Sequence, residues 1–460
     1  MTDFRKEKDL LGEEDVPAGA YWGIHTLRAI RNFRLSGVPV NPSLIRALAM
    51  VKKACAVANR ETEFLSEEKS AAIIRACEDI ASGQFIDQFP VDALQGGAGT
   101  STNMNLNEVI ANRAIELLGG NKGDYKLIHP LEHVNLNQST NDVYPTAVRI
   151  AIIYRLRDLA AGVAALQGAF QEKEKAFASI VKIGRTELQE AVPVTLGAEF
   201  SAFAEAIGRD RWRTFKCEER LRVVNLGGTA VGTGLAAPRN YIFLVIEKLR
   251  EVTGMGLSRG ENLMGETANT DAFVEASGIL KAHATNLIKI AGDLRLMNLL
   301  GEIHLPELQA GSSIMPGKVN PVMAEAAIQV GMKVIANDAL IADAASRGTF
   351  QINEFLPLLA HALLESLDLL AGIDALLSDH IRGIQADAAR CAFYFEHSPM
   401  IITALLPLIG YDRATDLLKT FYEGPDKNMK SFLEQIFGKE TIGKYLAPFA
   451  LTALGYKDRG

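Results

Sequence analysis

The sequence contains only four cysteines in 460 residues, and they are widely scattered. No two of them have the spacing of a metal-ligand pair or of a redox motif. We therefore expect four reduced thiols in a cytoplasmic chain, not a secreted protein held together by disulfides. Residues 1–19 are charged throughout and lack the apolar core of a signal peptide.

Long apolar runs and an excess of basic residues are also missing. No uninterrupted apolar stretch reaches the length of about 18 residues that a membrane-spanning helix needs, so we expect no such span. The net charge of -7 argues against nucleic acid as a partner, because binding a polyanion requires a concentrated basic face. A small anionic substrate is compatible with this charge, since a few local donors can dominate one pocket.

Alternating strand-like patterns are scarce, whereas helical periodicity is widespread. One seam of apolar residues at alternating spacings of four and three begins at Ile152, and a second repeats every seven residues. Further helical patterns cover residues 323–345 and 356–377. The seam positions are Leu156, Leu159, Val163, Leu166 and Phe170 in the first helix and Leu280, Leu287 and Leu294 in the second.

These patterns predict an all-α fold with a long central helix bundle. We expect an N-terminal helical domain (1–140), a central bundle (141–391) and a small C-terminal helical domain (392–460). The hydrophobic content of 48% indicates one large core and further apolar surface covered by other subunits. A structural coiled-coil protein would show similar seams, but it would not need the four polar loops described next.

Four loops are unusually rich in Ser, Thr, Asn and Gly: residues 96–105, 129–142, 184–190 and 311–321. The last resembles a phosphate-binding loop, but it has one residue too many between its glycines and Val319 where a Ser or Thr belongs. The glycine-rich run 227–234 lacks a lysine and a preceding strand, which leaves dinucleotide binding with weak support.

The segment His129–His133 formally fits an H-x-x-E-H zinc pattern, which requires a helix to place both histidines on one face. Pro130 at its second position argues against that helix, so we predict no metal. The remaining polar residues are neutral donors with one lysine, a set that suits carboxylate binding.

Elimination next to a carboxylate passes through an enediolate-like species, which preorganised donors and a cation stabilise. A general base must also reach the carbon-bound proton. The loop 311–321 contains no His, Asp or Glu, so a serine would have to serve as the base. Its pKa would need lowering, for which Lys318 and converging backbone N–H groups are the candidates.

The loop Gly311-Ser312-Ser313-Ile314-Met315-Pro316-Gly317-Lys318-Val319-Asn320-Pro321 resembles the signature of the aspartase/fumarase superfamily. The other three loops are similar to further blocks of that family, in the same order, over nearly the whole chain. The resemblance implies a homotetramer with a twenty-helix core and active sites assembled from loops of three subunits. It implies a reaction that needs no organic cofactor.

By the same resemblance, Ser312 is the general base, in a mobile loop that closes over the substrate. Lys318 and Asn320 are expected to bind the carboxylate that becomes the enediolate. Loop serines and threonines also commonly cap helices, which is the alternative for each of them. The other residues expected at the substrate are Thr100, Ser101, Ser139, Thr140, Asn141, Thr186, Glu187 and Ser313.

Within the superfamily, the segments 97–101, 139–142 and 305–310 resemble the aspartase forms. The implied reaction is the reversible conversion of L-aspartate to fumarate and ammonia, by serine-base proton abstraction through an enediolate. The alternatives are hydration of fumarate to L-malate and elimination from an N-substituted aspartate. A third alternative is a non-catalytic tetramer that serves as a structural or binding protein, against which the intact Ser312, Lys318 and Asn320 speak.

Glu187 is the sharpest departure from the family pattern, which usually has His or Gln at that place. Its carboxylate is turned away or paired with a cation, or it is protonated and donates a hydrogen bond, or it meets a cationic group of a larger substrate. The family's usual Ser-Gly-Pro-Arg segment is missing before Glu302, and residues 131–133 also differ. These departures leave Ser312 and Lys318 intact but open the identity of the substrate.

Overall fold

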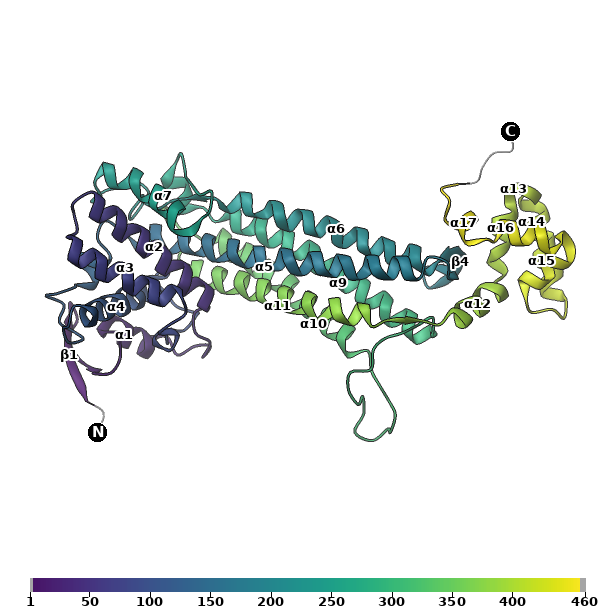
Figure 1. Cartoon of the computed structure of the whole chain (residues 1–460), viewed down its shortest axis with the longest axis horizontal. Coiled ribbons are helices and arrows are strands. Elements are labelled where there is room, and N and C mark those ends of the chain that lie inside the picture. Colours follow the sequence, from purple (N-terminus) through teal and green to yellow (C-terminus); the bar gives the residue numbers. More distant parts are fainter. Residues whose placement is uncertain (1–2, 456–460) are drawn as a thin grey trace. The chain divides into compact units, whose positions relative to one another are not determined.

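The computed structural model describes residues 3–455, and most of them are helical (Figure 1). Within that range the strands form only four two-stranded sheets, β1–β2, β3–β4, β5–β6 and β7–β8. The predicted all-α class is therefore confirmed. The four cysteines are free and buried, and burial raises the pKa of Cys55, Cys217 and Cys391 to about 12.

The chain forms two compact units, each built from three separate segments. The first unit holds the described residues of Met1–Leu159 together with Arg213–Ala282 and Lys333–Leu369. The second holds Ala160–Trp212, His283–Met332 and the described residues of Leu370–Gly460. Five long helices contribute to both units: α5 (Thr140–Ala176), α6 (Leu196–Leu221), α9 (Asp271–Leu300), α10 (Val322–Ser346) and α11 (Leu356–Arg382).

The long helices coincide with the periodic patterns in the sequence. Every seam position predicted for α5 and α9 is at most 2% exposed, and the patterns at 323–345 and 356–377 correspond to α10 and α11. Helix α11 is long and apolar enough to cross a membrane, but 61% of its most apolar stretch is buried inside the protein. That burial is what the core helix of a bundle requires. The division at residues 140 and 391 stays a prediction.

The first unit surrounds its part of the long helices with shorter elements. Helix α2 begins at Pro42, a favoured first residue, and Asn41 caps it by accepting a hydrogen bond from the N–H of Ser43. The remaining elements are β1 (Phe4–Asp9), β2 (Gly12–Pro17), α1 (Ile24–Asn32), α2 (Pro42–Glu61), α3 (Glu67–Ala81), η1 (Ile86–Gln88), α4 (Thr100–Leu117), η2 (Pro130–Val134), β5 (Val223–Val224), α7 (Arg239–Thr253), β6 (Ser258–Arg259) and α8 (Leu263–Ala268).

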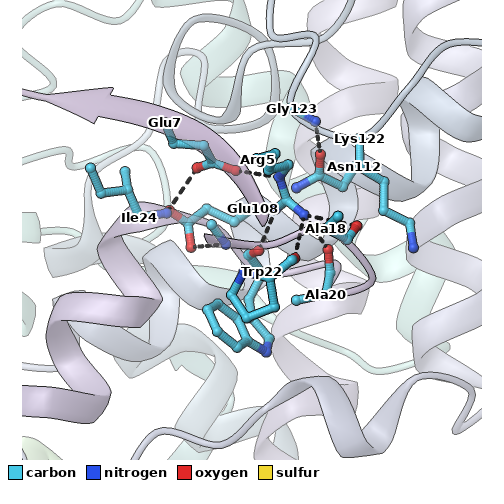
Figure 2. Close-up of polar contacts among 12 residues, drawn as sticks. Arg5, Glu7, Ala18, Ala20, Trp22, Ile24, Glu108, Asn112, Lys122 and Gly123 are labelled. Carbon is cyan, nitrogen blue, oxygen red and sulfur yellow. Dashed lines mark hydrogen bonds and ion pairs between the residues drawn. The ribbon is translucent and has the colours of Figure 1, made fainter. Parts of the chain in front are cut away.

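Figure 2 shows how the N-terminal hairpin β1–β2 and α4 both bind the residues that begin α1, where the N–H of Ile24 donates to Glu7 of β1. The buried carboxylate of Glu108 in α4 accepts hydrogen bonds from the backbone N–H groups that begin α1. Burial raises the pKa of Glu108 to about 7, although the hydroxyl of Thr26 and these N–H groups act in the opposite direction. Arg5 completes the attachment by donating to Glu7 and to the carbonyls of Pro17, Ala18, Ala20 and Trp22.

The second unit encloses a charged cluster inside its part of the bundle. The ring of His283 in α9 contacts Asp210 of α6 through Nδ1 at 3.0 Å and Asp374 of α11 through Nε2 at 3.0 Å. Asn286 donates a further hydrogen bond to Asp210 at 2.8 Å. The buried imidazole thereby joins three helices.

The rest of the second unit consists of short elements around one apolar cluster, which includes Ile401, Leu405, Phe421 and Leu433. Ile183 of β3 belongs to the same cluster, so the hairpin β3–β4 is packed against the C-terminal helices. These elements are β3 (Val181–Thr186), β4 (Gln189–Thr195), β7 (Ile303–His304), β8 (Gln385–Ala386), α12 (Ala388–His397), η3 (Pro399–Leu405), α13 (Leu406–Ile409), α14 (Tyr411–Glu423), α15 (Met429–Phe437), α16 (Lys439–Tyr445) and α17 (Pro448–Thr452).

Candidate active site

The start of α5 carries three of the predicted site residues, Ser139, Thr140 and Asn141. Ser139 caps the helix, because its Oγ accepts from the N–H of Asn141 at 3.2 Å. Asp142 reciprocates by accepting from the N–H of Ser139 at 2.9 Å. The capping alternative therefore accounts for one role of Ser139, while Thr140 is nearly buried.

Asp142 also fixes the glycine-rich run 227–234 beside this helix start. Its other carboxylate oxygen accepts from the backbone N–H groups of Gly227 at 3.1 Å and Thr229 at 3.0 Å. Burial raises the pKa of Asp142 to about 6, against the opposing effect of these N–H donors. A side chain at Gly232 would lie 2.3 Å from the backbone nitrogen of Met264. The glycines thus serve close packing around a buried carboxylate.

Pro145 lies inside α5 and leaves one helical hydrogen bond unmade. The carbonyl four residues earlier belongs to Asn141, and it accepts instead from the side-chain amide of Asn225 at 2.9 Å. The side chain of Asn141 in turn donates to the carbonyl of Ala230 at 2.7 Å. Asn141 is therefore held in place through both its backbone and its side chain.

Thr100 and Ser101 open α4, directly after Gly99. The φ of +94° at Gly99 favours glycine, and a Cβ there would lie 2.6 Å from the ring of Tyr144 in α5. This close approach brings the starts of α4 and α5 together within the first unit. A hydrogen bond of 3.0 Å from the amide of Asn103 to the Thr140 hydroxyl joins the same two helix starts.

Thr186 and Glu187 lie at the tip of the β3–β4 hairpin in the second unit. Thr186 pairs with Gln189, so Glu187 and Leu188 form a two-residue turn. Both turn residues have positive φ, 53° and 62°, although neither is Gly or Asn. The Glu187 side chain is exposed and makes no ion pair or hydrogen bond with any residue of the described range 3–455.

A buried carboxylate anchors this hairpin beneath its tip. Glu302 is fully buried and forms ion pairs with Arg185 at 2.7 Å and Lys182 at 2.7 Å. The guanidinium of Arg185 also lies over the ring of Tyr394, 5.3 Å from its centroid. Arg185 is thus held by an ion pair and by stacking on an aromatic ring, whereas the Glu187 side chain at the tip makes no such contact with any described residue.

The signature loop, residues 311–321, holds Ser312 in a particular local geometry. Its Oγ accepts hydrogen bonds from the backbone N–H groups of Ile314 at 3.2 Å and Met315 at 2.9 Å. Such donors favour the anionic form of a hydroxyl. At the base of the loop, Asn320 donates to the carbonyl of Gly311 at 2.9 Å and the N–H of Gly311 donates to the carbonyl of Lys318 at 2.7 Å.

Ser313 and Lys318 are exposed in the signature loop, and the ammonium of Lys318 has no partner within the described part of the chain. A cavity of about 460 Å³ opens at the base of the loop, lined by Asn320, His304 and Glu307 among other residues. The loop and the tip of the β3–β4 hairpin share no hydrogen bond or ion pair across the described residues of the second unit.

The segment 129–133 forms a single π-helical turn after His129 and lines a cavity of about 610 Å³ in the first unit. The Nδ1 of His129 accepts from the N–H groups of Leu131 and Glu132, and the Nδ1 of His133 accepts from the N–H of His129. A neutral His129 that accepts at Nδ1 carries its proton on Nε2 and presents a donor there. The Nε2 of His133 lies 2.8 Å from the ammonium of Lys69, so both ring nitrogens of His133 already have partners. Nothing in residues 3–455 gathers three or more His, Cys, Asp or Glu side chains that could hold a metal ion.

Sequence reasoning missed the polar residues that support the predicted ones. Lys52 of α2 is fully buried and donates to Asn135 at 2.8 Å and to Gln138 at 2.9 Å. The sequence did contain a sign of this burial. Lys52 and Lys53 interrupt an otherwise apolar stretch, and helical periodicity predicts that one of these two lysines faces the core. Asn103, which contacts Thr140, lies one turn after the predicted Thr100 and was equally accessible.

Comparison with known proteins adds independent findings. A model of the family described as Lyase matches residues 12–336. The chain is 50% identical to the aspartate ammonia-lyase of Pseudomonas aeruginosa over 458 residues, 97% of each chain. It is 49% identical to the aspartate ammonia-lyase of Pseudomonas fluorescens, over 92% of this chain and 90% of the relative. Among solved structures, a fumarate lyase:delta crystallin from Brucella melitensis bound to cobalt matches with a TM-score of 0.94 and 46% identity, over 98% of this chain and all of that one.

Proposed function

The chain belongs to the lyase family, and from this premise we propose that it catalyses the reversible elimination of ammonia from L-aspartate to give fumarate. The observation that carries the chemistry is the pair of backbone N–H groups on Ser312 Oγ. A serine that loses its proton needs such donors, because water is a far better solvent for an alkoxide than an apolar site.

In the proposed mechanism, the Ser312 alkoxide takes the proton from the carbon next to the side-chain carboxylate. The electron pair moves onto that carboxylate, which becomes an enediolate. Collapse of the enediolate forms the carbon–carbon double bond and breaks the bond between carbon and the substrate's ammonium nitrogen, so neutral ammonia leaves with the electron pair of the broken bond. Lys318 and Asn320 bind the carboxylate while its charge is doubled. Ser313 lies beside Ser312 in the same loop and would bind the substrate there.

The helix starts in the first unit suit the other anionic end of the substrate. The N-termini of α4 and α5 lie close together, and each presents the positive end of a helix dipole. Thr100, Ser101, Ser139, Thr140 and Asn141 lie at these two helix starts. We assign them, together with Thr186, to binding the substrate's carboxylate and amino group. No organic cofactor is needed for this reaction.

We further propose that the protein is a cytoplasmic homotetramer whose active sites combine loops of different subunits. Large apolar side chains exposed on the long helices support this arrangement, because a soluble monomer seldom leaves so many uncovered. They include Trp212 at 64%, Phe215 at 68% and Leu299 at 79% exposure. A further copy of the chain would cover them.

Glu187 favours a second candidate, elimination from an aspartate whose nitrogen carries a larger or cationic group. Its carboxylate lies at the hairpin tip with no partner in the described residues, beside the proposed ligand Thr186. An ammonium or guanidinium on the substrate would pair with it.

One experiment separates these functions. The purified protein is given fumarate with ammonia, with water alone, or with a panel of amines, and the products are identified by mass spectrometry. Aspartate from ammonia supports the proposal, and faster addition of a cationic amine supports the second candidate. Malate from water alone, with no amine adduct, would establish a hydratase and refute both.

A further inference from the structure

We propose that Lys52 is a positioning residue that sets the direction of the hydrogen bonds behind Thr140, so that the Thr140 hydroxyl offers its proton to a substrate carboxylate. The inference rests on the proposed function, because it takes Thr140 to be a substrate-binding residue. Lys52 itself lies behind the site, in the middle of α2, and touches no substrate.

Lys52 is a buried cation without a carboxylate in contact. It is 0% exposed, and within residues 3–455 no acidic group lies within ion-pair distance of it. Its two acceptors are the amide oxygens of Asn135 and Gln138, both in the segment that leads into α5. An unpaired buried ammonium is costly, so its presence calls for a reason beyond packing.

An ammonium can only donate, and this determines every neighbour in turn. Asn135 must present its oxygen to Lys52, and the same oxygen accepts from the amide nitrogen of Asn103 at 3.2 Å. The amide nitrogen of Asn103 therefore faces Asn135, and the same nitrogen also donates to the Thr140 hydroxyl at 3.0 Å. Because the Thr140 oxygen accepts this hydrogen bond, its own proton is free to point away from the network, as a donor.

Two unpaired oxygens show that the direction is imposed from Lys52. Asn107 also donates to the Asn135 oxygen, at 3.2 Å. The side-chain oxygens of Asn103 and Asn107 are buried, and neither has a partner among the described residues. Buried amides normally satisfy both ends. Here the oxygens of Asn103 and Asn107 accept no hydrogen bond from any described residue, while the N–H groups of both amides donate to the Asn135 oxygen, which also accepts from Lys52.

The charge state of Lys52 fits this role at neutral pH. Burial lowers its pKa to about 8, which leaves the amine mostly protonated. The ionisable groups that face it are Cys55 on its own helix, Cys77 on α3 and Asp142 on α5, and each acts to raise the pKa again.

A purely structural role for Lys52 predicts a different outcome from a positioning role. If Lys52 only held the fold, its loss would reduce the active fraction and the melting temperature but leave KM unchanged in the surviving molecules. If it positions Thr140, its loss raises KM in a protein that stays folded. Replacing a buried charge by an apolar group of similar volume is often neutral for stability, which makes the test practicable.

The test compares Lys52→Met and Asn103→Leu with the control Lys53→Met in the full-length protein. Lys53 neighbours Lys52 but pairs with Glu78 at 2.8 Å at the surface. We expect KM for L-aspartate to rise about tenfold in both Lys52→Met and Asn103→Leu, the size of one lost hydrogen bond to a charged group, and to stay unchanged in Lys53→Met. If Lys52→Met fails to fold, Asn103→Leu tests the inference instead. That variant removes the hydrogen bond from Asn103 to Thr140 but keeps the ammonium of Lys52. Unchanged KM in folded Asn103→Leu would overturn the inference.

Adding Thr140→Val separates this inference from the proposed function. If Lys52 acts through Thr140, the double variant Lys52→Met/Thr140→Val should have nearly the kcat/KM of Thr140→Val alone. Additive losses would show that Lys52 acts by another route and would refute the proposal. A wild-type protein that forms no fumarate from L-aspartate would instead refute the proposed function, and the variants would then not be needed.

Discussion

The sequence resemblance singles out Glu187 as the sharpest expected departure from the family's pattern, and the surroundings of its side chain narrow the interpretations. The carboxylate is exposed at the tip of a hairpin, and none of the described residues forms an ion pair with it. The interpretation that a neighbouring cation neutralises it is therefore not supported within one chain. Two roles at the substrate are left to distinguish: the carboxylate repels the substrate, or it takes part directly, either as a protonated hydrogen-bond donor or as the partner of a cationic group.

Glu187→Gln tests these two roles directly. If Glu187 only repels a dicarboxylate, removing its charge should retain or improve aspartate deamination, by about two- to tenfold in kcat/KM at low salt. The measurement is fumarate formation at several ionic strengths, because screening should reduce the difference between variant and wild type. Glu190→Gln, two residues beyond the turn, serves as the charge-matched control. A large loss of activity confined to Glu187→Gln would instead show that the carboxylate takes part directly.

Ser312→Ala removes the proposed base. We expect turnover to fall by at least about a thousandfold while assembly and substrate binding persist, since only one oxygen is lost from an exposed loop. Ser313→Ala is the matched control and should lose less. Calorimetric binding of L-aspartate to Ser312→Ala separates loss of chemistry from loss of binding. Undiminished turnover in this variant would contradict the assignment of Ser312.

At the residue scale, the sequence left the roles of single polar residues open. Ser139 was expected either to cap a helix or to bind substrate, and its capping contacts now account for the first. The role of Lys52 was not predicted. A helical pattern shows that one of two adjacent lysines faces inward, but it does not show that amide oxygens accept hydrogen bonds from the buried ammonium. The positive φ at Glu187 and Leu188 could not be foreseen either, since neither residue type favours it.

At the scale of elements, the His283 cluster joins α6, α9 and α11. Burial alone would lower the pKa of His283, but the carboxylates of Asp374 and Asp210 outweigh it and raise the pKa to about 10. An imidazole in the unfolded chain titrates near its ordinary pKa of about 6.5. The folded state therefore binds one more proton than the unfolded state between these two values.

The sign of this linkage gives a stability prediction. The stabilisation from His283 should be complete below about pH 6.5 and should be lost as the pH rises toward 10. His283→Leu leaves two buried carboxylates without their cation, and we expect a loss of about 3–5 kcal/mol at pH 7. Urea unfolding midpoints at pH 6, 7.5 and 9, at one protein concentration, provide the measurement. The surface variant Arg347→Gln, which breaks an exposed pair with Asp343, should change stability little. Equal midpoints for His283→Leu and wild type would contradict this account.

The long helices were the elements most readily predicted. An apolar seam arises whenever one side of a helix is buried, so it can be seen in the sequence alone. The seam residues of α5 and α9 are all buried. Pro145 shows what such a pattern omits, because a proline inside a helix would suggest a break. The helix continues because Asn225, distant in sequence, supplies the partner that the missing N–H cannot. A long-range contact of this kind leaves no local sign in the sequence.

At the scale of the whole molecule, the predicted homotetramer has a direct functional test. Ser312→Ala and Thr140→Val are each expected to impair every active site when present alone. If the two residues in one site come from different subunits, mixed tetramers regain some intact sites. Random mixing in equal amounts should restore about one quarter of wild-type activity, since each contributing chain is intact half of the time.

The complementation experiment uses co-expressed chains with two different tags, purified in tandem so that only mixed assemblies are assayed. Sedimentation analysis reports the number of subunits in the same samples. Two preparations mixed after purification serve as the control and should show no recovery unless subunits exchange. Absence of recovery in true mixed assemblies would place Ser312 and Thr140 of one chain in the same site.

The organisation into units was less accessible from the sequence than the helices were. The division into 1–140, 141–391 and 392–460 followed the polar, glycine-containing loops that bound the long central helices, and it stays a prediction. The two compact units of the structure are each assembled from three segments, with borders inside long helices. No change of composition marks such a border, because the helix keeps the same pattern of buried apolar residues on both sides of it.

The left-handed pair Glu187–Leu188 has a practical consequence for anyone who wishes to alter this protein. Two residues without a preference for that conformation cost about 1 kcal/mol each. Gly is favoured at the second position of such a turn, so Leu188→Gly would raise the melting temperature and leave Glu187 in place. Libraries that seek new amine partners at this tip can therefore start from a sturdier parent and accept riskier changes elsewhere.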